Sequence, residues 1–223
     1  MRQFLVSLAL LASVQTAGGE MSQVPAGVTR TQLVDNSSVL VARLKFEPGA
    51  AEQIHTHPFS AVVIQLTPGD VQMTIGSEKT SERREAGFAW FIPTGAPHAA
   101  VNVGTNACEF VTVAIKPGSH SSNSAPPTPP VPSGVTRTPV LENDQARVVK
   151  VAFAPGSREA VHSHAFDLLI IQLSSGRVET QLGTGKTVSE FGPGEVQFLP
   201  KDVPHAVANA GSTGFDLMSV GVK

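Results

Sequence analysis

Six of the seven histidines in this 223-residue chain form three pairs, each separated by 107 residues. The pairs are His55 with His162, His57 with His164, and His98 with His205. Two histidines spaced as His-x-His on a strand place both imidazoles on one face, because side chains alternate there. A third imidazole from another strand would complete a set facing one metal ion. We therefore expect two metal sites, each held by three histidines.

Imidazole nitrogen binds several divalent metals. The ligands therefore predict an ion of Fe, Mn, Ni, Cu or Zn but do not identify which one. Three neutral imidazoles leave the full charge of the ion in place and leave coordination positions open for water or substrate. The alternative is that all six histidines are structural. Their retention in two otherwise diverged copies favours metal ligation. The seventh, His120, has no counterpart and is expected to be solvated.

The histidines belong to a long internal repeat. Residues 28–116 align with residues 135–223 without a gap, and 31 of the 89 aligned positions are identical. A repeat of this length is a whole domain rather than a solenoid unit. Residues 117–134 between the copies are rich in proline and serine, as in a linker. We expect two domains of one fold, 28–116 and 135–223, joined by this linker.

Short strand-like runs must position the histidines. Runs rich in β-branched and aromatic residues occur at 39–46, 61–66, 71–75, 87–92 and 110–115. Gly, Pro, Asn and Asp separate these runs at intervals of about ten residues, which is typical of an all-β sandwich or barrel. Residues 78–86 could form a short helix. The matching segment carries glycine and ends in proline, so we expect a hairpin loop there instead.

The first 19 residues have the order of a secretory signal peptide: a basic start, an apolar run and a tail of small residues. The apolar run is too short to span a bilayer, which needs roughly 20 residues. We expect cleavage after Gly18 or Gly19. The mature protein is then expected to be exported, periplasmic or extracellular, with no membrane anchor.

Charge and cysteine content exclude several classes of function. The chain has 16 Lys and Arg against 18 Asp and Glu, and its only basic cluster is Arg83-Arg84, so we expect no nucleic-acid surface. The single cysteine, Cys108, excludes an internal disulfide and a cysteine-based zinc cage. Phenylalanine takes its place in the second copy, which indicates a buried hydrophobe. A small-molecule partner is expected, and homo-oligomer formation stays open.

The segments around the histidines resemble the two motifs of the cupin superfamily. The first motif, G-x5-H-x-H-x(3,4)-E-x6-G, is matched at 49–69 and 156–176 except at the glutamate. The second, G-x5-P-x-G-x2-H-x3-N, is matched at 87–102 and, with Asp202 at the inner glycine, at 194–209. The resemblance implies a bicupin. Each copy would be a double-stranded β-helix, or jelly-roll, barrel with the metal inside.

Both copies depart from the family pattern at the carboxylate ligand. Val62 and Leu169 take its place when four residues separate this position from the second histidine. Three-histidine cupin sites are similar to those of dioxygenases that cleave diketones and thiols with Fe(II). The resemblance therefore implies a dioxygenase acting on a small chelating organic substrate. It argues against oxalate decarboxylase-like chemistry, because that group uses three histidines and a glutamate on manganese.

Further residues shared by the two copies could shape the pockets. The glutamine pair would replace the missing carboxylate if a bulge turned it inward; otherwise it faces outward. The glutamate pair is expected at the rim or in a salt link, and the phenylalanine pair either lines the pocket mouth or packs in the core. Glu195 or Asp202 would add a carboxylate to the second site if either points inward. The shared residues are Gln65, Gln172, Glu52, Glu159, Phe59 and Phe166.

Three functions stay open on these grounds. The first is the metal-dependent dioxygenase, with no catalytic residue assigned beyond the metal ligands. The second is a non-enzymatic protein of the cell envelope that binds metal or a small molecule, because the sequence reveals no further acid–base group near the histidines. The third is a metal-dependent lyase or isomerase, which needs such a base.

Overall fold

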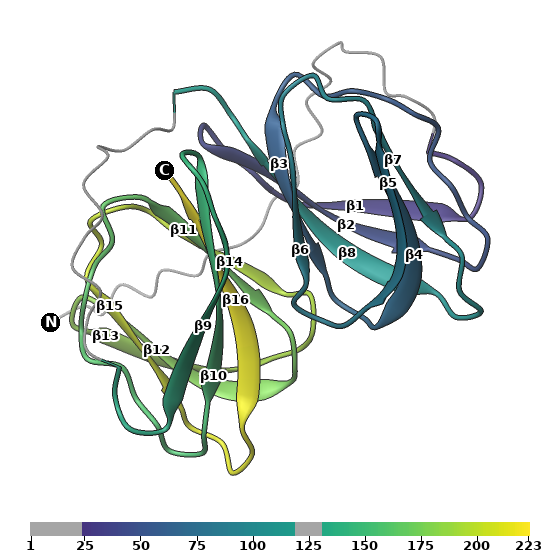
Figure 1. Cartoon of the computed structure of the whole chain (residues 1–223). Coiled ribbons are helices and arrows are strands. Elements are labelled where there is room, and N and C mark those ends of the chain that lie inside the picture. Colours follow the sequence, from purple (N-terminus) through teal and green to yellow (C-terminus); the bar gives the residue numbers. More distant parts are fainter. Residues whose placement is uncertain (1–23, 119–130) are drawn as a thin grey trace, which may run out of the picture.

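The computed structural model describes residues 24–118 and 131–223 (Figure 1). The expected signal peptide and His120 lie outside the described residues. The described parts form sixteen strands and contain no helix that could cross a membrane. The all-β prediction is confirmed.

Barrel 1 consists of eight antiparallel strands in two facing sheets. The larger sheet has the order β1-β2-β8-β3-β6 and the smaller one β5-β4-β7. The strands are β1 (Val28–Asp35), β2 (Val39–Phe46), β3 (Ser60–Gln65), β4 (Gly69–Ile75), β5 (Glu78–Arg84), β6 (Ala89–Ile92), β7 (His98–Asn102) and β8 (Cys108–Ile115).

Barrel 2 repeats this arrangement with sheets β9-β10-β16-β11-β14 and β13-β12-β15. The strands are β9 (Val135–Glu142), β10 (Ala146–Phe153), β11 (Asp167–Gln172), β12 (Gly176–Leu182), β13 (Gly185–Phe191), β14 (Val196–Leu199), β15 (His205–Asn209) and β16 (Phe215–Val222). In each barrel the two sheets enclose an apolar interior.

The segment after β4 differs from its expected loop. Residues Glu78–Arg84 form β5, which pairs with β4 along its full length. Gly76, at φ +60°, makes the tight turn between them. Every residue of β5 except the last is exposed, so no apolar alternation marked the strand in the sequence.

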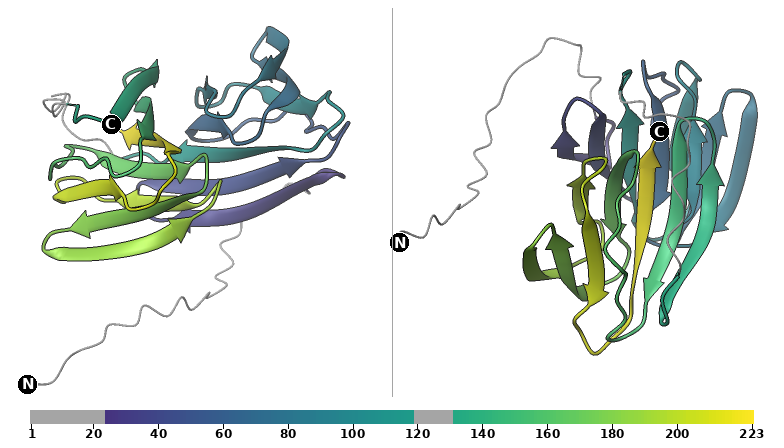
Figure 2. Two further views of the ribbon diagram at one scale, coloured as in Figure 1. Left: turned by 90° about the horizontal axis from the view of Figure 1, so that it is seen from below. Right: turned by 90° about the vertical axis from the view of Figure 1, so that its left-hand side faces the viewer.

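The two large sheets pack face to face and share one apolar core (Figure 2). This core contains eight pairs of residues that occupy equivalent positions in the two copies. The pairs are Val39 and Ala146, Val41 and Val148, Val62 and Leu169, Ile64 and Ile171, Leu66 and Leu173, Val111 and Met218, Val113 and Val220, and Ile115 and Val222. We call this set the inter-barrel core.

Contacts across the inter-barrel core are reciprocal. A Cβ added at Gly87 would lie 3.0 Å from Cδ1 of Leu173, and one at Gly194 would lie 2.9 Å from Cδ1 of Leu66. Both glycines have φ above +80°, so a side chain would be strained there as well as crowded. β1 contacts β14, and β9 contacts β6. Since β9 is the equivalent of β1 and β14 that of β6, the two contacts are equivalent.

The facing of β3 and β11 corrects one sequence interpretation. Val62 and Leu169 point into the inter-barrel core and are fully buried there, so neither stands at a barrel interior. Ala61 instead packs among the residues inside barrel 1, and Leu168 lines the interior of barrel 2. Ala61 and Leu168 therefore hold the inward position near the histidines. Neither is a carboxylate, so the expected acidic ligand is missing from both copies.

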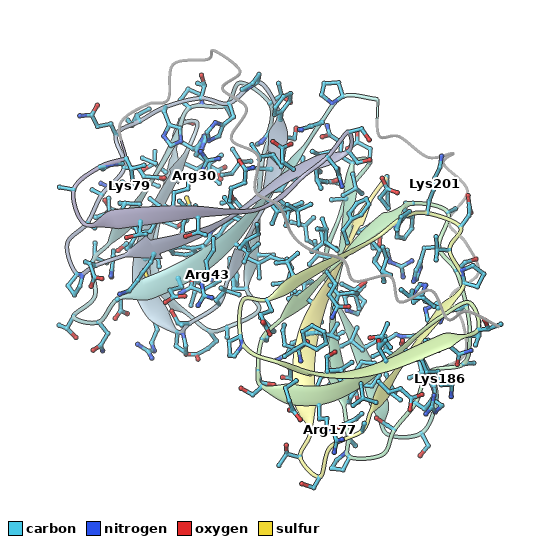
Figure 3. All side chains as sticks on the ribbon, turned by 180° about the vertical axis from the view of Figure 1, so that it is seen from behind. Arg30, Arg43, Lys79, Arg177, Lys186 and Lys201 are labelled. Carbon is cyan, nitrogen blue, oxygen red and sulfur yellow. The ribbon has the colours of Figure 1, made fainter. Side chains whose placement is uncertain are left out.

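Many charged side chains lie on the surfaces of the two barrels. Figure 3 labels six basic residues that are spread over the two units. Three of them are ion-paired: Arg43 with Glu109, Arg177 with Glu190, and Lys186 with Glu179. Nearby carboxylates thus neutralise these cations.

Candidate metal centres

Strand pairing at one end of barrel 1 gathers its three histidines. His55 and His98 exchange both backbone hydrogen bonds, with N to O distances of 3.0 and 2.9 Å. His57, two residues further on, presents its ring to the same side. The three ring centroids lie 4.3–4.9 Å apart.

Barrel 2 gathers His162, His164 and His205 in the same way. His162 and His205 exchange backbone hydrogen bonds of 2.9 and 2.8 Å, and the ring centroids lie 4.5–5.2 Å apart. In each barrel the three ligand nitrogens lie within 4.8 Å of one another, a grouping that could hold a metal ion.

The turn before the third histidine is built by the second motif. Gly95 at φ +71° and Asp202 at φ +62° take the same left-handed conformation, and their N–H groups donate to the carbonyls of His57 and His164. Aspartate tolerates the left-handed region better than most residues do, so Asp202 can stand where the first copy has glycine. Asp202 is therefore a turn residue and does not line the cavity of barrel 2.

Backbone carbonyls orient the imidazoles. Nδ1 of His55 lies 2.9 Å from the carbonyl oxygen of Gln53, and Nδ1 of His98 lies 3.0 Å from that of Ala96. His162 and His205 make the same contacts at 2.8 and 2.9 Å. Since a carbonyl only accepts, Nδ1 carries the hydrogen and Nε2 keeps its lone pair for a metal.

The nitrogen spacing fits a shared ion. Nε2 of His55 and Nε2 of His57 are 3.1 Å apart. Two nitrogens that each lie about 2.1 Å from one ion, at nearly a right angle, are about 3 Å apart. With a third imidazole beside them and no carboxylate in the set, the donors fit a divalent transition metal with open positions.

The surroundings favour the neutral form of four of the imidazoles. Burial lowers the pKa of His57 to about 4, and electrostatic repulsion involving His55, His98 and Arg30 adds to the shift. Burial likewise lowers the pKa of His164 to about 4, helped by its histidine and arginine neighbours. The pKa values of His98 and His205 are also lowered, again chiefly by burial. Neutral imidazole is the form that binds metal.

Metal retention should therefore extend to unusually low pH. Because the pKa of His57 and of His164 is about 4 rather than near 6.5, protons compete for these nitrogens only as the pH falls toward 4. We expect the chain to keep its metal at pH 5.5 and to release it below about pH 4. Dialysis at pH 7, 5.5 and 3.5, followed by elemental analysis, measures this.

Circular dichroism of the same samples separates release from unfolding. The metal-free fold should itself lose stability as the pH falls from 6.5 to 4, because the unfolded chain then binds protons that the folded chain does not. Half-release near pH 6.5 from folded protein would contradict the prediction, which rests on the lowered pKa values of His57 and His164.

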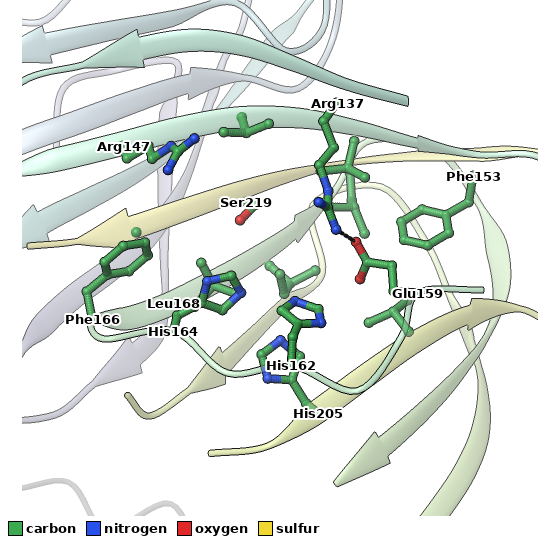
Figure 4. A pocket seen from close by; sticks show the side chains of 16 residues that line it. Arg137, Arg147, Phe153, Glu159, His162, His164, Phe166, Leu168, His205 and Ser219 are labelled. Atoms are coloured by element: carbon green, nitrogen blue, oxygen red, sulfur yellow. Dashed lines mark hydrogen bonds and ion pairs between the residues drawn. The ribbon is translucent and has the colours of Figure 1, made fainter. Parts of the chain in front are cut away.

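A cavity of about 90 Å³ opens onto the histidines of barrel 2 (Figure 4). Apolar side chains make up much of its wall, with Arg137, Arg147, Glu159 and Ser219 as the other polar residues. The apolar lining is Val149, Val151, Phe153, Phe166, Leu168, Ile170, Val207, Leu217 and Gly221. Such a mixture of apolar walls and few polar groups is typical of a small-molecule site.

These features agree with comparisons to known proteins. A sequence profile of the cupin domain matches residues 42–114. The beta-alanine degradation protein BauB of Pseudomonas aeruginosa is 33% identical over 96 residues, which are 43% of this chain and all of that relative. This chain belongs to the cupin family. With two such barrels it is a bicupin.

Solved structures share the two-barrel fold. AerE from Microcystis aeruginosa has a TM-score of 0.74 at 14% identity, covering 91% of the bicupin and 95% of that chain. An oxalate decarboxylase from Lactobacillus farciminis has a TM-score of 0.69 at 13% identity, covering 88% and 82%. Salicylate 1,2-dioxygenase from Pseudoaminobacter salicylatoxidans has a TM-score of 0.65 at 11% identity, covering 83% and 72%. Identities this low establish the fold alone.

Glu159 of the bicupin lies at the cavity and is ion-paired. Its Oε1 accepts from Arg137 Nη2 at 2.5 Å, and both side chains are at least 85% buried. The salt link expected from the sequence thus coexists with a place in the pocket wall. In barrel 1, burial raises the pKa of Glu52, while His55 and Arg30 act against this rise. Arg30 and Arg137 are equivalent positions that sequence reasoning passed over, although both copies keep the arginine.

Phe166 packs beside the histidines of barrel 2. Its ring stacks on His164, with centroids 5.5 Å apart and planes inclined by 25°. The glycine at 221 makes room for it, because a Cβ there would lie 2.3 Å from Cε2 of Phe166. Barrel 1 has Ala114 at the matching position, and its Phe59 is half-buried.

Replacing Gly221 with alanine should therefore displace the Phe166 ring and destabilise the bicupin by about 1–3 kcal/mol, as overpacking does. Chemical denaturation of the metal-free protein measures this change. Gly185→Ala is a matched control, since its Cβ would meet nothing closer than 3.5 Å. If the two variants had equal free energies of unfolding, the Phe166 ring would be able to move aside without destabilising the fold.

Three other expected pocket residues are not brought to the histidines. Gln65 lies at the far end of β3, roughly 16 Å along the strand from Ser60, and its Nε2 donates to the Thr67 carbonyl at 2.9 Å. Gln172 is buried but is not part of the cavity wall. Glu195 also stays outside that wall and accepts from the Gly192 N–H.

Proposed function

We propose that this bicupin is an exported, iron-dependent dioxygenase that acts on a small chelating organic substrate. The observation that carries this proposal is the donor set in barrel 2: three imidazoles, no carboxylate in the group, and a small cavity that they line. A three-imidazole set leaves positions for two substrate oxygens and for dioxygen. When bound, Fe(II) would supply Lewis acidity and the electrons that activate dioxygen.

The chain's own residues would bind and shelter the substrate. Phe166, Leu168 and Ile170 form an apolar wall that keeps water from the reacting atoms. The carboxylate of Glu159, at the other side of the cavity, is placed to accept a proton from an acidic carbon of a diketone-like substrate. Sequence reasoning found no such group near the histidines.

Two lines of reasoning support dioxygen chemistry and export. A salicylate 1,2-dioxygenase among the structural neighbours makes dioxygen chemistry compatible with this fold. The signal-like order of the first 19 residues supports export. Mass spectrometry of the protein from native cells tests the latter: the mature chain should begin at residue 19 or 20 and be recovered outside the cytoplasm.

Oxygen uptake tests the activity. Protein purified from its own compartment should contain iron and consume dioxygen with at least one member of a panel of diketones, flavonols and thiols. His205→Ala should abolish that consumption, and His98→Ala is the matched variant in barrel 1. Stoichiometric iron without turnover of any substrate would favour the non-enzymatic binding protein.

A lyase or isomerase is the second candidate, and the place of Glu159 favours it because that chemistry needs a base. The same assay separates the two. Substrate that disappears without oxygen consumption would identify a lyase or isomerase, and Glu159→Gln should then slow the reaction by roughly 100-fold or more.

A further inference from the structure

The two barrels differ in charge at one inward-facing position. Arg147 on β10 lines the cavity of barrel 2, and its counterpart on β2 of barrel 1 is Leu40. The neighbouring arginine, Arg137, does not distinguish the barrels, since Arg30 matches it. Arg147 thus adds one cation to barrel 2 only.

Arg147 points its charge toward the histidines. Figure 4 shows its guanidinium at the side of the cavity that also holds Phe166, facing His164 across the space. The side chain is 27% exposed, and its buried Nε has no hydrogen-bond partner among the described residues. Its positive charge is felt at His164, where it helps to lower the pKa of that imidazole.

The carboxylate nearest to Arg147 already has another partner. Glu142 Oε2 forms an ion pair with Arg147 Nε at 3.3 Å, while its Oε1 accepts a hydrogen bond from Lys223 Nζ at 2.6 Å. Barrel 1 repeats this lysine–carboxylate pair as Lys116 and Asp35, with leucine where barrel 2 has arginine. The pair therefore forms without an arginine, and Arg147 is not needed to complete it.

The remaining polar wall does not supply a counter-charge for Arg147. The carboxylate of Glu159 is engaged by Arg137. Ser219 presents a hydroxyl to the middle of the cavity, where it could donate a hydrogen bond. The other lining side chains, apart from the histidines, are apolar. Within the cavity wall itself two arginines stand against one carboxylate, and the partner of Arg147, Glu142, lies outside that wall.

We propose that barrel 2 selects a small organic anion, whose carboxylate binds the Arg147 guanidinium while its other oxygens reach the histidine-bound metal. Guanidinium groups recognise carboxylates well, because their donors match the two oxygens. Barrel 1 lacks this recognition and takes a different, uncharged ligand or none. The inference rests on metal binding in barrel 2 under the proposed function, but it does not depend on dioxygen chemistry.

The dimensions suit an anion of a few carbon atoms. The volume of about 90 Å³ accommodates several water-sized groups. Two oxygens for the metal and one carboxylate for Arg147, joined by two or three carbons, meet these limits. A short-chain diketone acid has this chemistry.

Calorimetry on zinc-loaded protein tests the inference without any turnover. The probes are 2,4-dioxovalerate and its methyl ester, which share one diketone chelate and differ in charge. Wild-type protein should bind the acid about 10- to 100-fold more tightly than the ester, as expected for a charge-assisted contact. Arg147→Leu, which installs the residue of barrel 1, should remove this preference. Arg177→Leu, at a 58% exposed arginine outside the cavity, should retain it.

Two further variants make the result decisive. Arg147→Gln removes the charge with less change in polarity and serves if the leucine variant does not fold. Leu40→Arg should give barrel 1 a second site with the same preference for the acid. Equal binding of acid and ester by wild-type protein, or a preference that survives both Arg147 variants, would overturn the inference. Oxygen uptake with neutral diketones tests the dioxygenase proposal separately.

Discussion

Replacing His205 with alanine should reduce the metal content of the chain from two ions to one. His205 supplies one of three nitrogens within 4.8 Å of each other, and no carboxylate in that group can take its place. Losing an orienting partner of a ligand already costs about 10- to 100-fold in affinity, so losing a ligand itself should cost at least as much. Elemental analysis after gel filtration measures the content.

His98→Ala is the matched variant, and it should empty barrel 1 while barrel 2 keeps its ion. The double variant should hold no tightly bound metal. Because neither ring belongs to the inter-barrel core, the metal-free variants should still fold and unfold in one cooperative transition. Loss of both ions from either single variant would refute two independent sites.

Leu169→Glu should destabilise the protein by about 3–5 kcal/mol, because it places an unpaired carboxylate in the inter-barrel core where Leu169 is fully buried. Leu168→Glu, one residue earlier, puts the same group into the cavity beside the histidines. There the carboxylate can become a fourth ligand, so metal should bind more tightly than in wild-type protein. Denaturation with and without zinc measures both effects.

The pair of variants also tests the facing of β11. Zinc should restore stability to the Leu168 variant and give the Leu169 variant no more than it gives wild-type protein. If zinc rescued the Leu169 variant preferentially, the strand would face the opposite way, as the sequence interpretation had it.

That facing could not be predicted from apolar periodicity. An isolated barrel has one buried face per strand, and alternation then shows which residues point inward. Here β3 and β11 are buried on both faces, between a barrel interior and the inter-barrel core. Ala61 and Val62 are consequently both apolar, as are Leu168 and Leu169. The packing of the two barrels was the missing information.

The histidines were predictable for the opposite reason. A polar ring kept at one position in both copies of a diverged repeat stands out, and His-x-His needs only local strand geometry to place two rings together. Arg147 gave no such signal, because its counterpart is leucine and the strand that carries it has polar residues on both faces. The repeat reveals what the two barrels share and hides what distinguishes them.

The reciprocal packing of the barrels has the form of a twofold homodimer contact held within one polypeptide. In a true homodimer a single altered codon changes both subunits together, so a new cation would appear in each pocket. Joined in tandem, the copies can acquire different residues while their common interface still buries both large sheets. Duplication within one gene thus allows two ligand preferences on one scaffold, and the alignment of Leu40 with Arg147 marks a position where the copies have diverged.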